Sequence, residues 1–198
     1  MKGQKSLLTL WIIHLTVTEF KQKAVFFDRD GVLNHLVKRD GSYYSPQKFE
    51  DFDIVNEAKE VVDHVHKMDY LAIVISNQPD ISRGKLEQSE LDKMTQSLIN
   101  ETKVDDVFYC THDDDNDTGC RKPAPGLFFT AQKKYNIDFN KSFMIGDTWK
   151  DVEAAKNAGI SMILINRDYN QSLQKVKRIN TLNEAVLQIN SDFSHENS

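Results

Sequence analysis

Short apolar runs alternate with longer segments of helical periodicity along most of the chain. Runs that are apolar on both faces are typical of strands buried inside a parallel sheet, and they predict strands at 24–27, 71–75, 104–109, 142–145 and 161–165. Apolar residues at helical spacing predict helices between these strands, at 56–67, 86–100, 125–135 and 148–158, with a shorter one at 182–189. The alternation predicts an α/β fold: a Rossmann-like, doubly wound parallel sheet with helices on both faces.

The pattern is weaker at both ends of the chain. We predict one domain at 21–170, an N-terminal extension at 1–20, and a C-terminal helix with a disordered tail at 171–198. Residues 1–20 have the layout of a signal peptide, but they lack a small-residue cleavage site and their apolar run is too short to span a bilayer. They are either an extra packing element or the product of a start site assigned too far upstream. We favour the second, which predicts a cytoplasmic protein without membrane contact.

Polar side chains follow the ends of three predicted strands. In open α/β sheets ligands bind at the carboxyl ends of the strands, so acidic residues there indicate a site more than a solvated surface. A hydroxyl or amide at the same edge suits a phosphoryl oxygen. The candidates are Asp28 and Asp30 after the first strand, Ser76 and Asn77 at the second, and Asp147 after the fourth.

A lysine and a further acid complete the set of candidate residues. Lys122 lies in the segment Arg121-Lys122-Pro123, directly before a predicted helix, and offers a compact positive charge to a transferring phosphoryl group. Asp151 lies one helical turn after Asp147. It either orients Lys122 or the waters of a metal, or is a solvated helix acid.

Four segments, D-R-D-G-V-L-N, S-N-Q, R-K-P and G-D-T-W-K-D, follow one another in a fixed order and together resemble the haloacid dehalogenase superfamily over about residues 23–167. The resemblance implies that Asp28 attacks phosphorus to form an aspartyl-phosphate and that Asp30 is the general acid and base. It also implies Mg²⁺ held by Asp28, the backbone carbonyl of Asp30, and Asp147. Ser76, the backbone amide of Asn77, and Lys122 would bind the phosphoryl group.

A narrower resemblance rests on the words D-R-D-G-V-L-N, S-N-Q, S-R-G and C-R-K-P-x-P-G, which are similar to the branch of heptose bisphosphate phosphatases and histidinol-phosphate phosphatases. These enzymes have no large cap domain, and the predicted helices leave no room for one here. Substrate would then be chosen by loops at 34–49, 79–85 and 110–122. Arg83 and Arg121 are candidates to grip substrate oxygens, with a mobile surface charge as the alternative for Arg83.

The two cysteines lie in the last of these loops. In the branch this region often carries structural zinc, which implies Cys110, His112 and Cys120 as ligands, but Thr118 stands where another ligand is expected and closed zinc sites have four. Zinc completed by a neighbouring aspartate, two reduced thiols, and a disulfide all remain open. The acidic run at 113–117 lacks the glycine and glutamate of a calcium loop and is interpreted as a solvated loop.

Composition narrows the function without naming a substrate. The 198 residues carry a net charge of −5 and show no basic patch, which argues against a nucleic-acid partner. We expect a monomeric Mg²⁺-dependent phosphatase of a small sugar phosphate, with a heptose 1,7-bisphosphate preferred over histidinol phosphate. A nucleic-acid 3′-phosphatase and a receiver-type signalling module are weaker alternatives, the latter because its acceptor aspartate stands alone on a middle strand.

Overall fold

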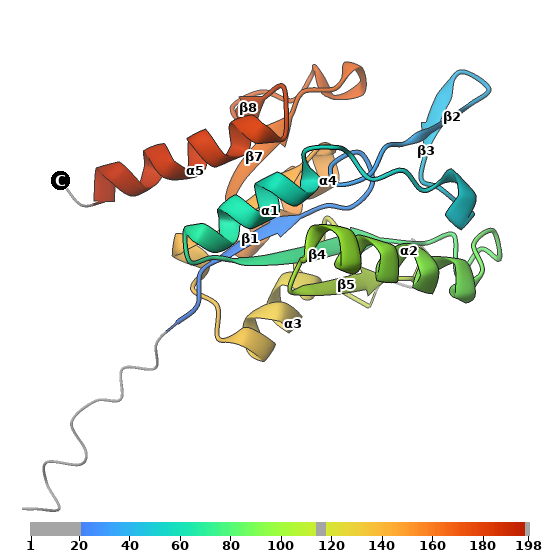
Figure 1. Ribbon diagram of the computed structural model, residues 1–198, viewed down its shortest axis with the longest axis horizontal. Coiled ribbons are helices and arrows are strands. Elements are labelled where there is room, and N and C mark those ends of the chain that lie inside the picture. Colours follow the sequence, from blue (N-terminus) through green and yellow to red (C-terminus); the bar gives the residue numbers. More distant parts are fainter. Residues whose placement is uncertain (1–20, 114–117, 197–198) are drawn as a thin grey trace, which may run out of the picture.

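The structure, a computed structural model, describes residues 21–113 and 118–196 (Figure 1). The predicted extension at 1–20 lies outside the described residues. Six strands form one sheet in the order β5-β4-β1-β6-β7-β8, and every neighbouring pair is parallel. They are β1 (Ala24–Phe27), β4 (Leu71–Asn77), β5 (Asp106–Cys110), β6 (Phe143–Gly146), β7 (Ser161–Ile165) and β8 (Lys177–Ile179). The predicted parallel α/β sheet is confirmed.

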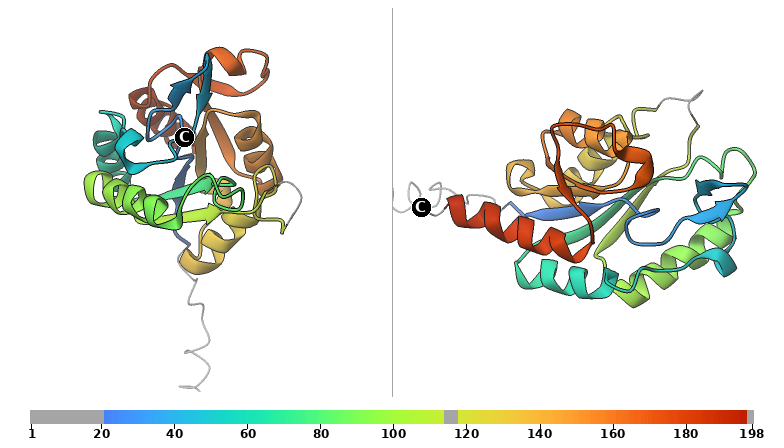
Figure 2. Two further views of the ribbon diagram at one scale, coloured as in Figure 1. Left: turned by 90° about the vertical axis from the view of Figure 1, so that its right-hand side faces the viewer. Right: turned by 90° about the horizontal axis from the view of Figure 1, so that it is seen from above.

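In the described part of the chain, five α-helices cover the two faces of this sheet. They are α1 (Ala58–Lys67), α2 (Gln88–Thr102), α3 (Gly126–Tyr135), α4 (Trp149–Ala158) and α5 (Asn183–Glu196). The right-hand view of Figure 2 shows α5, α1 and α2 along one side of the sheet and α4 on the other. The central strands β1, β4 and β6 are therefore buried on both faces, which explains why their apolar residues form runs and do not alternate with polar ones.

Strand β1 lies at the centre and divides its side chains between two cores. Val25 and Phe27 point into the core that contains α1 and α5, whereas Ala24 and Phe26 point into the core that contains α3 and α4. The chain leaves β1 on one side to reach β4 and later returns to β6 on the other. The crevice at such a reversal of strand order is where ligands bind in open sheets.

The segment expected to be a loop at 34–49 contains a small hairpin of β2 (Val37–Arg39) and β3 (Ser42–Tyr44). Its turn is formed by Asp40 and Gly41, both with positive φ, as two-residue hairpin turns require. Figure 1 shows the hairpin projecting beyond the carboxyl ends of β1 and β4. Three-residue strands exposed to solvent carry too little apolar pattern to be predicted.

The segment after residue 170 contributes to the same core. Strand β8 extends the sheet, and Ile179, Leu182, Ala185 and Ile189 are buried against the β1 and α1 side chains. The predicted C-terminal helix is present, but it continues to Glu196 through residues we expected to be disordered. Within the described ranges, no helix is both long and apolar enough to cross a lipid bilayer. The domain limits predicted from the sequence stay a prediction.

Candidate active site

The polar residues at the strand ends line one cavity of about 580 Å³. Strand β1 delivers the first two aspartates, β4 ends in the serine and asparagine, and β6 leads into the last acid. The hairpin closes one side through Ser42 and Tyr43. The sequence candidates that line the cavity are Asp28, Asp30, Ser76, Asn77, Arg121, Lys122 and Asp147.

Asp28 lines this cavity, is buried and lies beside the ammonium group of Lys122. Its Oδ1 accepts a hydrogen bond of 2.7 Å from the Arg29 backbone amide and lies 3.0 Å from Nζ of Lys122. Burial raises the pKa of Asp28 to about 7, and the lysine partly offsets that rise. The carboxylate is thus poorly solvated, which favours its use as a nucleophile.

Lys122 is almost completely buried and is held by three oxygen atoms. Its Nζ donates to Oδ1 of Asp151 at 2.6 Å and to the carbonyl of Ile75 at 3.0 Å, in addition to its contact with Asp28. Burial disfavours its charge, but Asp151 and Asp28 outweigh this and raise the pKa of Lys122. A permanent positive charge therefore stands beside the Asp28 carboxylate.

Asp151 belongs to the structure of α4 as well as to the site. Its Oδ2 accepts from the Thr148 backbone amide at 2.9 Å and from the Thr148 hydroxyl at 2.6 Å, which makes it part of a capping box at the start of the helix. Its other oxygen faces Lys122, and the side chain is fully buried. The sequence left open whether Asp151 orients Lys122 or is a solvated helix acid. The structure places it against Lys122 and not in solvent.

Asp30 has different surroundings from Asp28, two residues away. Arg29, itself fully buried, donates to both oxygens of Asp30 at 2.8 and 3.0 Å through one nitrogen. Nδ2 of Asn34 donates to Oδ1 at 3.1 Å. Nε2 of Gln78 donates to Oδ2 at 2.7 Å and also contacts the Ser76 hydroxyl at 3.0 Å. The network fixes Asp30 beside the serine.

Asp147 follows β6 and is 1% exposed. The hydroxyl of Tyr169 donates to its Oδ2, and Nδ2 of Asn170 donates to its backbone carbonyl at 2.8 Å. Among the described residues, Oδ1 of Asp147 has no hydrogen-bond partner although it is buried. Burial raises the pKa of Asp147 to about 8, and the nearby Asp28 contributes. A buried carboxylate oxygen without a donor is suited to a cation.

Comparison with known proteins places this arrangement in a family. Residues 119–184 match the HAD-hydrolase-like family. A D-glycero-beta-D-manno-heptose-1,7-bisphosphate 7-phosphatase of Vibrio cholerae is 33% identical over 156 residues, which cover 73% of this chain and 81% of that protein. A D-glycero-alpha-D-manno-heptose-1,7-bisphosphate 7-phosphatase of Photorhabdus laumondii is 36% identical over 152 residues, covering 71% and 80%. The chain belongs to the HAD-like heptose bisphosphate phosphatases.

Solved structures of HAD-like phosphatases share the fold. The D,D-heptose 1,7-bisphosphate phosphatase of B. bronchiseptica, crystallised with magnesium and phosphate, superimposes with a TM-score of 0.73 at 23% identity, covering 86% of this chain and 99% of that one. The enzyme of Burkholderia thailandensis gives a TM-score of 0.62 at 18% identity, covering 86% and 99%. The expected fold without a large cap domain is confirmed.

The acidic residues of this HAD-like phosphatase fit a divalent cation. Carboxylate oxygens of Asp28, Asp147 and Asp151 lie within 4.8 Å of one another. Asp151 has both oxygens engaged, by Lys122 and by the start of α4, whereas one buried oxygen of Asp147 has no donor in the part of the chain that the structure describes. Asp28 and Asp147 are therefore the side chains suited to Mg²⁺, a hard cation that prefers oxygen ligands. The contribution predicted for the Asp30 backbone carbonyl stays a prediction.

Three further candidates differ in their placement. Nδ2 of Asn77 donates to the Lys122 carbonyl and its Oδ1 accepts from the Lys122 amide, both at 2.9 Å, so this side chain aligns the lysine. Arg121 lines the cavity and is 9% exposed. Arg83 lies outside the residues that line it, in ion pairs with Asp113 at 2.5 Å and Asp80 at 3.3 Å.

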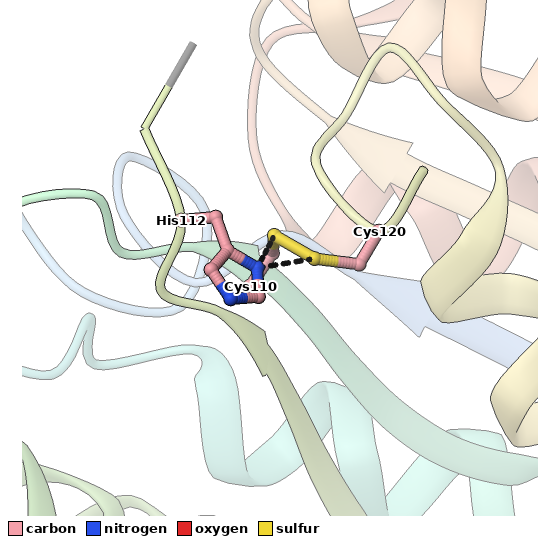
Figure 3. Close-up of side chains that lie close together, drawn as sticks. All are labelled: Cys110, His112 and Cys120. Carbon is pink, nitrogen blue, oxygen red and sulfur yellow. Dashed lines mark hydrogen bonds between the residues drawn. A yellow bond between two sulfur atoms is a disulfide. The ribbon is translucent and has the colours of Figure 1, made fainter. Parts of the chain in front are cut away.

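The zinc site implied by the family pattern is not supported. Cys110 and Cys120 form a disulfide, and Figure 3 shows the His112 ring beside it, with Nδ1 3.9 Å from one sulfur and 3.5 Å from the other. Zinc binds thiolates, and bonded sulfurs are not thiolates. Thr118 donates to the Cys120 sulfur at 3.1 Å, so the residue that replaces the expected ligand belongs to the same cluster.

Sequence reasoning missed several residues of the site. Arg29, Asn34 and Gln78 lie within the motifs D-R-D-G-V-L-N and S-N-Q and donate to Asp30. The sequence alone does not reveal which side chains turn toward this carboxylate. Tyr169 and Asn170 lie after β7, where the apolar pattern fades. Their position just beyond the carboxyl end of a parallel strand is the one signal that could have found them.

Proposed function

We propose that this phosphatase removes the 7-phosphate of D-glycero-D-manno-heptose 1,7-bisphosphate in a Mg²⁺-dependent reaction through an aspartyl-phosphate. The observation that carries the proposal is the buried Asp28 carboxylate, 3.0 Å from Lys122 and two residues from a separately held Asp30. The choice of a heptose bisphosphate as substrate is supported by the relatives, which are named for this substrate. The phosphate-bound B. bronchiseptica enzyme, which contains magnesium, supports the metal.

The first half of the reaction belongs to Asp28. A carboxylate oxygen forms a bond to phosphorus while the bond from phosphorus to the substrate oxygen breaks, which leaves an aspartyl-phosphate and the free sugar hydroxyl. Lys122 favours the ionised form of Asp28 and offsets negative charge on the transferring group. The Ser76 hydroxyl, which lines the same cavity, is available to donate to a phosphoryl oxygen.

Asp30 supplies and removes the protons. It donates one to the leaving sugar oxygen in the first half, and it takes one from the water that attacks the aspartyl-phosphate in the second. The attack releases inorganic phosphate and regenerates Asp28. Arg29 and Gln78 hold the Asp30 carboxylate in place, and Gln78 links it to Ser76. This link keeps the proton donor close to the residue that receives the phosphoryl oxygens.

Asp28 and Asp147 would hold the Mg²⁺, with the Asp30 carbonyl as a further ligand. When bound, the ion reduces repulsion between the Asp28 carboxylate and the phosphate. The substrate's sugar would lie between the hairpin and the segment that carries Arg121, because Tyr43 and Arg121 both line the cavity. Arg121 offers a guanidinium to a second phosphate.

The test is phosphate release, with and without Mg²⁺, from a matched panel of both heptose 1,7-bisphosphate anomers, histidinol phosphate, simple hexose phosphates and a 3′-phosphorylated oligonucleotide. We expect strong preference for one heptose anomer, since relatives are named for each. Preference for histidinol phosphate or for the oligonucleotide would overturn the heptose bisphosphate as the substrate and put the preferred compound in its place. Stable phosphorylation without release would favour a signalling module.

We also infer a monomer located in the cytoplasm, where sugar phosphates are made. The Cys110–Cys120 disulfide is unusual for that compartment, because its thiols are kept reduced. Cell fractionation, with free thiols alkylated at lysis, measures the location of the protein and the redox state of Cys110 and Cys120 in one experiment. Recovery of the oxidised protein outside the cytoplasm would overturn the location, and size-exclusion chromatography with light scattering measures the assembly state.

A further inference from the structure

We propose that Tyr169 is a positioning residue of the metal site, whose hydroxyl holds Asp147 so that one carboxylate oxygen stays directed at the cation. The inference rests on the proposed function in one respect, that the cation is Mg²⁺. Tyr169 lies in the 3₁₀ helix η3 (Asp168–Asn170), just after β7 and far along the chain from the other site residues.

The two oxygens of Asp147 have different surroundings. Oδ2 accepts from the Tyr169 hydroxyl, whereas Oδ1 is buried without a hydrogen-bond donor among the described residues. A donor on one oxygen fixes the rotation of a carboxylate and leaves the other oxygen as the acceptor for an ion. Such outer partners orient metal ligands and tune their affinity.

The Tyr169 hydroxyl also lies against the turn that carries the first aspartates. A Cβ atom placed on Gly31 would be 3.2 Å from this hydroxyl and 2.2 Å from Oδ2 of Asp147. The absence of a side chain at Gly31 therefore lets the tyrosine, Asp147 and the Asp28–Asp30 turn approach one another. Tyr169 as a whole is 47% exposed, but its hydroxyl reaches the buried carboxylate of Asp147.

The residues on either side of Tyr169 anchor it to the turn that contains Gly31 and to the turn that contains Asp147. Nδ2 of Asn170 donates to the carbonyls of Asp147 and Ile165, each at 2.8 Å, and this asparagine is 2% exposed. Nη2 of Arg167 donates to the Gly31 carbonyl at 2.7 Å. These contacts of Asn170 and Arg167 fix the backbone around Tyr169 and therefore the position of its hydroxyl.

The ring of Tyr169 has a second neighbour on the hairpin. Its centroid lies 6.5 Å from that of Tyr43, so Tyr169 contacts the hairpin with its ring and Asp147 with its hydroxyl. Removing only the hydroxyl separates the two contacts, because phenylalanine keeps the ring.

The experiment is calorimetric titration of Mg²⁺ into metal-stripped protein, comparing the unsubstituted chain with Tyr169→Phe, Tyr44→Phe and Asp147→Asn. Tyr44 is a matched control, since it is a half-exposed tyrosine that lies outside the cavity lining, on the hairpin that the Tyr169 ring contacts. We expect Tyr169→Phe to weaken Mg²⁺ binding about 10- to 100-fold, the range for outer partners of metal ligands. Tyr44→Phe should keep the Mg²⁺ affinity, and Asp147→Asn should abolish binding.

Kinetics distinguish positioning from a merely structural role. In Tyr169→Phe the Mg²⁺ concentration for half-maximal activity should rise by the same factor as the dissociation constant, with kcat restored at saturating Mg²⁺. A Mg²⁺ affinity within twofold of the unsubstituted chain would overturn the inference, as would a kcat defect that Mg²⁺ does not rescue. Thermal unfolding of the metal-stripped variant checks that it is folded.

The outcomes also separate this inference from the proposed function. Mg²⁺ binding that depends on Tyr169, without hydrolysis of any sugar phosphate, would support the inference and overturn the substrate. An unsubstituted chain that hydrolyses the substrate but shows no Mg²⁺ binding would overturn the inference and leave the substrate standing.

Discussion

Asp28 and Asp30 show how two identical side chains acquire different chemistry from their neighbours. Asp28 faces a buried lysine and an acidic cluster, and burial raises its pKa to about 7. Asp30 accepts from Arg29 and Gln78, which occupy both of its oxygens. The Asp28 carboxylate is therefore placed beside the Lys122 ammonium group, and the Asp30 carboxylate is held next to Ser76 by Gln78.

Replacing Asp28, the proposed nucleophile, tests its assigned role directly. Asp28→Asn removes the attacking oxygen but little volume, so turnover should fall on the order of 10³-fold or more while the fold is kept. Phosphate release and circular dichroism measure the two effects. Asp92→Asn, an exposed position on α2, is the matched control and should be fully active. Hydrolysis by Asp28→Asn near the normal rate would contradict a covalent mechanism.

The raised pKa values predict how stability depends on pH. Asp28 and Asp147 keep protons up to about pH 7 and 8 in the folded protein, whereas the unfolded chain loses them near the ordinary value of 3.8. The folded state then binds more protons between these limits, so the metal-free protein should lose stability as pH rises from about 4 to 8, by up to ~1.4 kcal/mol per pKa unit and proton.

Mg²⁺ should reverse this loss, because it requires deprotonated ligands. We expect the increase in melting temperature on adding Mg²⁺ to be larger at pH 8 than at pH 6, measured by calorimetry in buffers of matched ionic strength. Asp147→Asn should reduce both the Mg²⁺ effect and its pH dependence. A Mg²⁺ effect that is equal at the two pH values would contradict the assignment of these carboxylates.

At the scale of elements, the site depends on close approach between turns that follow different strands. Gly31 has a φ of +85°, in the left-handed region that favours glycine, and its missing side chain makes room for Asp147. The capping box of Thr148 and Asp151 starts α4 while Asp151 also holds Lys122. The same residues thus serve the local element and the chemistry.

Substitutions at two glycines distinguish the effect of backbone strain on stability from the effect of the close approach between the turns. Gly31→Ala and Gly41→Ala both place a side chain at positive φ, which costs ~1–2 kcal/mol. The added Cβ meets Asp147 Oδ2 at 2.2 Å in the first and open space in the second. Urea unfolding should therefore show a larger loss of stability for Gly31→Ala, together with weaker Mg²⁺ activation. Equal losses would show that only backbone strain matters.

At the scale of the whole molecule, the C-terminal segment completes the fold instead of trailing from it. Strand β8 pairs with β7, and α5 buries its apolar side against α1. The turn between β7 and β8 carries Tyr169 into the cavity. Folding of this segment and assembly of the site are therefore linked.

Two positions on α5 test this link. Ile189 is fully buried, so Ile189→Ala should cost ~2–5 kcal/mol of unfolding free energy. Leu187, on the same helix, is 68% exposed, and Leu187→Ala should change stability by less than ~0.5 kcal/mol. Urea unfolding followed by circular dichroism should show a single transition in both. A separate early transition, or equal losses, would show that α5 is not part of the cooperative domain.

The sequence predicted most of the sheet because its five longer strands are apolar on both faces, and it missed β2, β3 and β8 because three polar or exposed residues leave no such pattern. It placed Asp28, Lys122 and Asp147 at strand or helix ends, and the structure brings them into one cavity. It left two alternatives for Arg83, a grip on substrate oxygens or a surface charge, and the structure pairs this guanidinium with Asp113 and Asp80 outside the cavity lining.

By itself, the sequence determined the order of the five longer strands and the helices along the chain, the family, and which acids stand at strand ends, because these follow from local periodicity and short motifs. Only the tertiary structure decided that Asp151 pairs with Lys122, that Oδ1 of Asp147 is buried without a hydrogen-bond donor among the described residues, and that Tyr169 reaches Asp147 from the turn after β7. It also joined Cys110 to Cys120 in place of a zinc site. The physical reason is that hydrogen bonds and burial depend on distances between segments far apart in the chain, which no local pattern encodes.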